Sequence, residues 1–352
     1  MSAPALHWPS LLTRLLAGED LDEELAGQIM GALMRGEAES SQVAGLLIAL
    51  RAKGETPGEI AGFVRSMLDA ALPFEPPGGR PDHLVDIVGT GGDGAGTFNI
   101  STVAALVIAA AGVPVAKHGN RAASSRCGSA DLLEAWGVDI ELPPAAVARC
   151  LGEVGITFLY ARSFHPAMRY VAPVRLQLGV PTVFNVLGPL SNPAGVVHQA
   201  VGVSDARLAP VMADALARLG RRHAVVFRGE DGLDELTTTG PSRLWEIRDG
   251  VVTASTFDPA SLGIERARPA DLEGGDTQDN LRIADAVLGG REGPAADIVA
   301  LNAAAGLYAA DAVPDLAAGW ARAREVLASG AALALKERWA EHTRQLAGGV
   351  RG

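Results

Sequence analysis

The sequence predicts an α/β fold, with a small N-terminal helical domain and a larger α/β domain built on a mainly parallel central sheet covered by helices. The first seventy-odd residues carry apolar side chains at helical spacing. From residue 84 onward, short apolar runs alternate with glycine-containing loops and helical segments. Strands that alternate with helices require crossover connections, and these make a sheet parallel and bury both of its faces.

The N-terminal segment has several helix signals. Apolar residues recur every three or four positions over 43–50 and again over 60–68. Charged or polar residues that can cap a helix stand before these runs, and glycines stand after them. We therefore expect capping boxes at Asp20 with Glu23 and at Thr56 with Glu59, helix ends near Gly36 and Gly54, and a linker over 73–79.

The remaining chain is divided by the same kinds of signal. Apolar runs of four to six residues mark strands, and Asp249 with Gly250 marks the turn of a hairpin. The expected strands are 84–88, 113–116, 156–161, 199–203, 224–227, 244–247 and 251–256; the expected helices end at Gly112 or cover 130–136 and 208–219, with mostly helix from 284.

Composition and charge exclude several function classes. The 352 residues are 48% apolar, which is enough for a large core and a second domain, and the net charge is −11. No basic run indicates a nucleic-acid groove, and no stretch reaches the ~18 apolar residues of a membrane span. The first thirty residues lack a signal-peptide pattern, and Cys127 and Cys150 are expected to be unpaired thiols. We expect a cytoplasmic protein.

A loop with five glycines, 89–97, follows the first expected strand. Its spacing fits a dinucleotide fingerprint, but the next strand ends in Lys117 rather than in an acidic residue. A Walker loop is also excluded, since Ala95 rather than Lys follows Gly94. The loop leads into Asn99 and Ser101 at a helix start, where free amides and the helix dipole attract anions. These residues therefore favour an anion site over a simple capped helix.

Basic and hydroxyl side chains follow the next strand and should face the same cleft. Two cations and three hydroxyls beside a glycine loop suit a pyrophosphate better than a single phosphate. We expect Ser129 to cap the following helix, and we assign no acid–base role to His118. The residues are Lys117, His118, Asn120, Arg121, Ser124, Ser125 and Ser129.

Asp234 and Glu235 lie in an acidic loop after the strand 224–227, again at a carboxyl end. An isolated acidic run is usually a solvated turn. Opposite a polyphosphate site it gains a function, because Mg²⁺ prefers one or two carboxylates together with phosphate oxygens and water. We therefore expect a magnesium site at this loop.

Together these residues resemble the anthranilate phosphoribosyltransferase family of tryptophan biosynthesis. The resemblance extends from the N-terminal helices nearly to the C-terminus. It departs from the family at 160–164, and at Cys127, where the family often has serine. The matching stretches are 89–93, 97–102, 117–121, 128–131, 165–168, 173–175, 184–190, Asn192 with Pro193, and 231–235.

The resemblance implies a fold and a homodimer. A helical domain, 1–73, would be joined in space by about 166–192, and 74–165 with 193–352 would form the α/β domain that binds 5-phosphoribosyl 1-pyrophosphate (PRPP). The homodimer would form through the helical domain, and the active site would lie at the hinge.

The resemblance also implies the substrate and metal residues. Lys117 and Arg175 would serve catalysis, and Mg²⁺, as two ions with the donor bound, would meet Ser101, Asp234 and Glu235. Anthranilate would meet Gly89, Asn120 and Arg175. PRPP would contact Gly89, Gly92, Asp93, Thr97, Asn99, Ile100, Ser101, Thr102, Lys117 and Ser129.

Two other functions remain open at this point. A pyrimidine-nucleoside phosphorylase shares the expected architecture, but it uses inorganic phosphate and has no need of Asp234 and Glu235 for a metal. A non-enzymatic relative that binds nucleic acid would show a basic face, whereas this chain is acidic. Both fit the sequence less well than the transferase.

Overall fold

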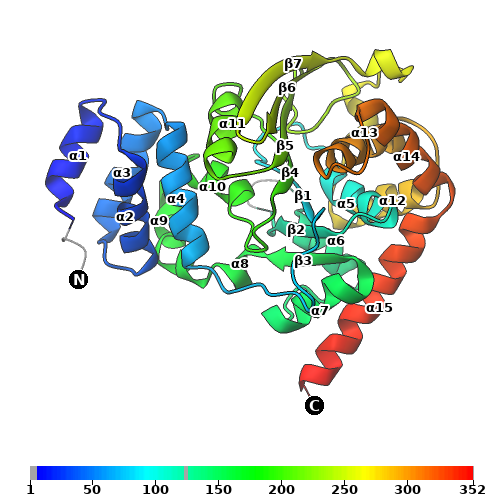
Figure 1. Cartoon of the computed structure of the whole chain (residues 1–352), viewed down its shortest axis with the longest axis horizontal. Coiled ribbons are helices and arrows are strands. Elements are labelled where there is room, and N and C mark those ends of the chain that lie inside the picture. The colour runs from blue at the N-terminus through cyan, green and yellow to red at the C-terminus, as the bar shows by residue number, and fades with distance from the viewer. Residues whose placement is uncertain (1–5, 123–125, 352) are drawn as a thin grey trace.

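The computed structural model describes residues 6–122 and 126–351, and its N-terminal part is a bundle of four helices. These helices form one end of the molecule in Figure 1, beside the larger α/β part. The prediction of a helical domain followed by an α/β domain is therefore confirmed. The four helices are α1 (Trp8–Leu16), α2 (Glu23–Met34), α3 (Ser40–Lys53) and α4 (Pro57–Asp69).

One of the two predicted capping boxes is present. Thr56 accepts a hydrogen bond from the amide of Glu59, whose side chain accepts one from the Thr56 amide at 2.8 Å. The prediction for Asp20 is wrong. Asp22 caps α2, while Asp20 pairs with Lys53 at 2.7 Å, because the chain reaches helical geometry only at Glu23. Gly36 and Gly54 follow α2 and α3 with positive φ angles, as expected of helix ends.

A seven-stranded sheet forms the centre of the α/β part, in the order β3-β2-β1-β4-β5-β6-β7. The first five of these strands are parallel, and β6 and β7 form the predicted antiparallel hairpin. The second strand begins two residues later than expected and ends at Gly119. The bounds are β1 (Val85–Gly89), β2 (Val115–Gly119), β3 (Ile156–Tyr160), β4 (His198–Gly202), β5 (His223–Gly229), β6 (Ser242–Arg248) and β7 (Val251–Phe257).

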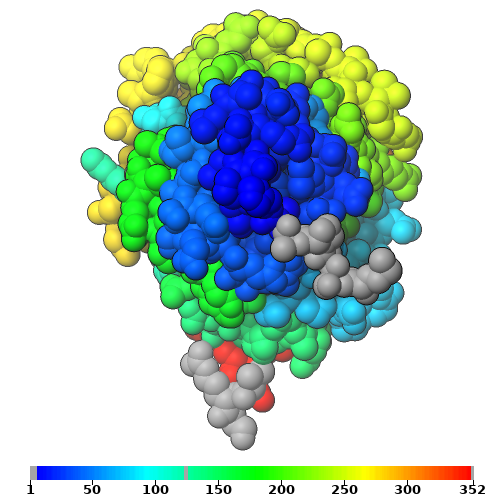
Figure 2. Space-filling view, turned by 90° about the vertical axis from the view of Figure 1, so that its left-hand side faces the viewer, coloured from blue at the N-terminus to red at the C-terminus, as the bar shows by residue number. Residues whose placement is uncertain are grey.

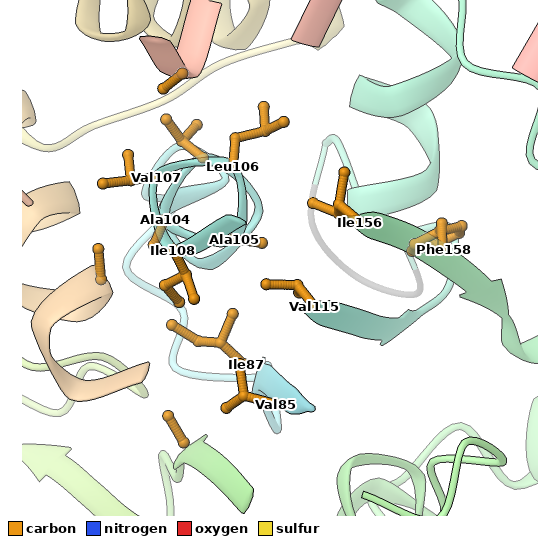
Figure 3. Packing of buried hydrophobic residues seen from close by; sticks show 14 of the residues in the cluster. Val85, Ile87, Ala104, Ala105, Leu106, Val107, Ile108, Val115, Ile156 and Phe158 are labelled. Atoms are coloured by element: carbon orange, nitrogen blue, oxygen red, sulfur yellow. The ribbon is translucent and has the colours of Figure 1, made fainter. Parts of the chain in front are cut away.

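Helices cover both faces of the sheet. On one face, α5 (Ile100–Ala110) and α13 (Pro294–Ala309) pack on the central strands, and Figure 3 shows α5 against Val85, Ile87 and Val115. On the other face lie α11 (Leu208–Arg218), α4 and α10 (Phe184–Leu190). The other helices are α6 (Ser129–Ala135), α7 (Pro144–Val154), α8 (Ala161–Phe164), α9 (Ala172–Leu178), α12 (Thr277–Leu288), α14 (Leu316–Ala328) and α15 (Ala331–Arg351), with short 3₁₀ turns at Pro166–Tyr170, Pro259–Leu262 and Pro269–Asp271.

The segment between β3 and β4 connects the two parts of the molecule. Its helix α9 packs against α3 of the N-terminal bundle, and α10 packs against α4. Val174 and Phe184 of this segment share a buried apolar cluster with the bundle. Within the described residues, no helix has both the length and the apolar character needed to cross a membrane.

Candidate active site

The acidic loop folds back into the sheet, so that Asp234 and Glu235 are less than a tenth exposed. Asp234 Oδ2 accepts a hydrogen bond from the Gly91 amide at 2.6 Å, and Glu235 Oε1 accepts one from the Ser101 amide at 3.2 Å. Burial, then the nearby charge of Asp93, raises the pKa of Asp234 to about 7. Burial and then Asp234 raise the pKa of Glu235 well above its usual value. The structure thus brings the two predicted carboxylates to the predicted glycine loop.

The glycine loop depends on backbone conformations that other residues adopt poorly. Gly91, Gly92, Gly94 and Gly96 all have φ between 67° and 77°. A Cβ atom at any of these four would meet no heavy atom within 4 Å, so there is open space beside this part of the loop. This loop can therefore present its amides to an anion of variable shape.

Lys117 is buried beneath the glycine loop on β2. Its Nζ donates to the Ile87 carbonyl at 2.8 Å and lies 3.3 Å from Ser101 Oγ. Burial lowers the pKa of Lys117, and the charges of Asp86 and Glu235 oppose that effect. The Lys117 cation therefore interacts with two acidic residues, Asp86 and Glu235, and with Ser101 in the first turn of α5.

The helix that follows the loop begins without a side-chain cap from its N-cap residue. Asn99 occupies the N-cap position of α5, yet its side chain caps no amide. Instead Asn99 bonds the Cys127 carbonyl at 3.1 Å and the side chain of Asn280 at 3.0 Å. The amides at the start of α5 are thus left without a side-chain cap from Asn99. Thr97 pairs with Glu273 in an isolated β-bridge, Ile100 is the first residue of α5, and Thr102 is buried in the first turn of that helix.

Two expectations about the segment after β2 need correction. Ser129 is the first residue of α6 rather than its N-cap. Gly128 is the N-cap residue, and its amide donates to Asp131 at 2.8 Å. The Ser129 Oγ donates to the Asn120 carbonyl at 3.1 Å. Arg121 pairs with Glu134 and Asp131, because α6 presents both acids to it, and so it is not a free cation. Ser124 and Ser125 lie outside the described residues.

A cavity of about 910 Å³ adjoins the glycine loop and reaches α9 and α10. Gly89, Asn120 and Arg175 line it together with His118 and His165. The two imidazole rings are 5.3 Å apart. Burial, then His165, lowers the pKa of His118 to about 3, so this ring is neutral at pH 7.

Arg175 is the half-buried cation of this cavity. Its guanidinium lies 5.2 Å above the ring of Phe184. Burial lowers its pKa, and among the described residues no carboxylate forms an ion pair with it. A planar guanidinium held against an aromatic ring at a cavity wall is suited to bind a carboxylate from solution.

Gly202, which sequence reasoning missed, supports the acidic loop from behind. It is the register partner of Gly89, and a Cβ atom at Gly202 would lie 1.7 Å from the backbone oxygen of Asp234. At Gly89 a Cβ would lie 2.2 Å from Asp234 Oδ2. The sequence shows that Gly89 and Gly202 each end an expected strand. Only the order of the strands in the sheet shows that the two glycines are paired.

The chain matches both parts of one known family. A family model described as the α/β domain of a glycosyl transferase family matches residues 81–333, and the model of the helical bundle domain of that family matches 9–71. An anthranilate phosphoribosyltransferase of Arthrobacter sp. (strain FB24) is 53% identical over 343 residues, covering 96% of each chain.

Two solved structures extend this similarity. The anthranilate phosphoribosyltransferase of Thermus thermophilus matches with a TM-score of 0.89 and 52% identity, over 95% of this chain and 99% of that one. The Saccharomyces cerevisiae enzyme in complex with PRPP and Mg matches with a TM-score of 0.87 and 28% identity, over 96% of this chain and 98% of that one. The observed fold is therefore that of these enzymes.

The close approach at Gly202 generates a test. Gly202→Ala should lower the free energy of unfolding by roughly 1–3 kcal/mol, because the Asp234 backbone must move to admit a methyl group. Gly240→Ala is the matched control, since its Cβ would meet no atom within 4 Å. Urea unfolding of both variants measures the difference. Equal midpoints for the two would show that the Gly202 contact does not constrain the loop.

Proposed function

The chain belongs to the anthranilate phosphoribosyltransferase family, and we propose that it transfers the phosphoribosyl group of PRPP to the amine of anthranilate, releasing pyrophosphate. The observation that carries this proposal is that a glycine loop bonded to buried carboxylates, with a buried lysine beside it, adjoins a cavity lined by Gly89 and Arg175. The product, N-(5-phosphoribosyl)anthranilate, makes this the second step from chorismate to tryptophan.

We propose that PRPP binds across the glycine loop and the start of α5. The positive φ angles of Gly91 and Gly92 support close approach of its phosphates, and the positive end of the α5 dipole, which the Asn99 side chain does not cap, supports an anion there. Lys117 is the buried cation of this half-site. The proposed donor contacts are Gly89, Gly92, Asp93, Thr97, Asn99, Ile100, Ser101, Thr102, Lys117 and Ser129.

The residues of the acidic loop fit a magnesium site. Two buried carboxylates with raised pKa values are unfavourable without a cation, and the hydroxyl of Ser101 is close to Lys117 beside them. We propose that Ser101, Asp234 and Glu235 hold Mg²⁺, with two ions when PRPP is bound. Magnesium supplies neutralisation of the pyrophosphate charge as that group leaves.

Anthranilate is proposed to lie in the cavity, with its carboxylate toward Arg175 and Asn120. The absence of an internal ion pair for Arg175 in the described chain supports this assignment. The reaction replaces the C1–O bond to pyrophosphate with a C1–N bond, through a transition state that resembles an oxocarbenium ion. Lys117 and the loop amides stabilise the leaving charge, which is worth roughly 10²–10³ in rate for one such donor. The aromatic amine is neutral at pH 7, so no general base is assigned.

The domain boundaries also remain a proposal. We infer that 1–73 forms the helical domain together with about 166–192, supported by the packing of α9 on α3 and of α10 on α4. Residues 74–165 and 193–352 then form the PRPP-binding domain. The cytoplasmic location expected from the sequence stays a prediction.

The two other functions lose support. Identity of about half over nearly the whole length of curated anthranilate phosphoribosyltransferases favours the transferase over a nucleoside phosphorylase. The same similarity, with the complete acidic pair, argues against a nucleic-acid-binding relative that has lost catalysis.

The first test is the reaction itself. When the protein is mixed with PRPP, Mg²⁺ and anthranilate, the fluorescence of anthranilate should decay as it reacts, and EDTA should stop the decay.

The double variant Asp234→Asn with Glu235→Gln tests the proposed metal ligands. It should have a kcat/KM at least ~100-fold lower and a higher Mg²⁺ requirement, because both proposed ligands lose their charge. Glu230→Gln, an exposed acid of the same loop, is the control and should behave as wild type. Normal metal response in the double variant would place the magnesium site elsewhere.

A second test concerns the acceptor. Arg175→Ala should raise the KM for anthranilate roughly 10- to 100-fold, as expected for loss of a charge-assisted hydrogen-bond pair, while the KM for PRPP changes little. The KM of Arg175→Lys for anthranilate should lie between those of wild type and Arg175→Ala, since lysine keeps the positive charge but lacks the planar pair of donors. Arg169→Ala is a control at the same cavity, because Arg169 already bonds Tyr170. Unchanged anthranilate kinetics in Arg175→Ala would refute the assignment.

A third test concerns assembly, since we propose a homodimer through the helical end that faces the viewer in Figure 2. Leu16 on α1 and Leu176 on α9 are 77% and 84% exposed, and both helices contact α3. Leu16→Asp with Leu176→Asp should convert a dimer into a monomer in sedimentation equilibrium. Val251→Asp, a similarly exposed residue on the distant β7, should not. A monomeric wild type would contradict the proposal.

A further inference from the structure

The C-terminal end of α10 is held by side chains at every successive carbonyl. Because α10 ends at Leu190, its last carbonyls lack the amide donors that a further helical turn would supply. Within this segment, each carbonyl from Gly188 to Ser191 instead meets a side chain. His118, Gln199, Arg221 and His165 contact the carbonyl oxygens of Gly188, Pro189, Leu190 and Ser191, at 3.1, 2.6, 3.1 and 3.0 Å. The next residue, Asn192, donates back to the Ala116 carbonyl of β2 at 2.8 Å.

Asp86 lies at the centre of these contacts, on β1, with no exposed surface. Its Oδ1 accepts the backbone amide of His118 at 3.1 Å, and its Oδ2 accepts Gln199 Nε2 at 3.3 Å. The Asn192 side chain also interacts with this carboxylate. Asp86 thus contacts the strand that carries Lys117 and, through Gln199, the end of α10.

Two buried cations flank Asp86. Burial raises the pKa of Asp86 to about 6 and outweighs the attraction of Lys117, which lowers it, so the carboxylate is charged at pH 7. Arg221 is the second cation. Its Nε donates to Gln199 Oε1 at 3.2 Å, and the charge of Asp86 opposes the fall in the Arg221 pKa that burial causes. One buried carboxylate therefore interacts with two buried cations, Lys117 on β2 and Arg221 just before β5.

The two ends of this network reach different substrates. Lys117 belongs to the proposed pyrophosphate half-site, whereas Phe184 and Asn185 of α10 line the acceptor cavity, with Phe184 beneath Arg175. We propose that Asp86 is a positioning residue that fixes Lys117 and α10 relative to each other, so that donor and acceptor are held at reacting distance. This inference rests on the proposed function. Asp86 itself is proposed to touch neither PRPP nor anthranilate.

Asp86→Asn tests the proposal, because it keeps the shape and one hydrogen-bond acceptor but removes the charge. The KM values for PRPP and anthranilate should both rise, and kcat should fall roughly tenfold or more, since small misplacements of reacting groups cost rate steeply. Steady-state kinetics with each substrate varied in turn measures this, alongside urea unfolding of the same preparations.

Gln199→Met separates the two arms of the network. It removes the bonds of Gln199 to Asp86, Pro189 and Arg221 but leaves the bond that the His118 amide donates to Asp86. The KM for anthranilate should rise while the KM for PRPP stays nearly unchanged. Thr157→Val is the matched control for loss of a buried hydrogen bond in the same sheet, here to Val147 at 2.9 Å, and should leave both KM values unchanged.

The outcomes are separable. An inactive wild type would contradict the proposed function, not the network. With an active wild type, Asp86→Asn that loses stability but keeps both KM values would reduce Asp86 to a purely structural residue. A rise in only one of the two KM values would contradict the coupling. If Asp86→Asn does not fold, Gln199→Met alone decides, because unchanged anthranilate kinetics there would refute the link to α10.

Discussion

Asp234 and Glu235 are buried where the parallel strands end, and the remainder of the cleft is arranged around this burial. A carboxylate removed from water is unfavourable unless charges or hydrogen bonds compensate it. Here the amides of Gly91 and Ser101 and the cation of Lys117 supply part of that compensation, yet the pKa values of both acids stay raised. Such a site favours a divalent cation, and the solved structure of the Saccharomyces cerevisiae relative is a complex with PRPP and Mg.

The same constraint accounts for the glycines and for the depth of the lysine. Gly89 and Gly202 face each other on adjacent strands, and only residues without a Cβ leave room for the Asp234 backbone and carboxylate. Lys117 stays on the strand instead of in the following loop, since β2 continues to Gly119. The Lys117 cation therefore interacts with both Glu235 and Asp86, and Asp86 is bonded to Gln199, which also bonds the Pro189 carbonyl of α10.

Local sequence signals predicted the elements better than the contacts between them. The capping box at Thr56, the hairpin at Asp249 and the glycine loop were all identified because their chemistry is complete within a few residues. Asp20, Arg121 and Ser129 were misjudged for the opposite reason. Lys53 lies 33 residues from Asp20, and the partners of Arg121 and Ser129 depend on how α6 meets the end of β2.

The sequence by itself determined the fold class, the glycine loop and the acidic pair, since apolar periodicity, clustered glycines and adjacent carboxylates act over short stretches of chain. Only the tertiary structure decided which distant groups come into contact. The approach of Gly202 to Asp234, the stacking of Arg175 on Phe184 and the bonding of Asp86 to Gln199, 113 positions away, join distant parts of the chain. Such contacts follow from strand order and helix packing, and no local pattern encodes the pairing of two distant side chains in a buried space.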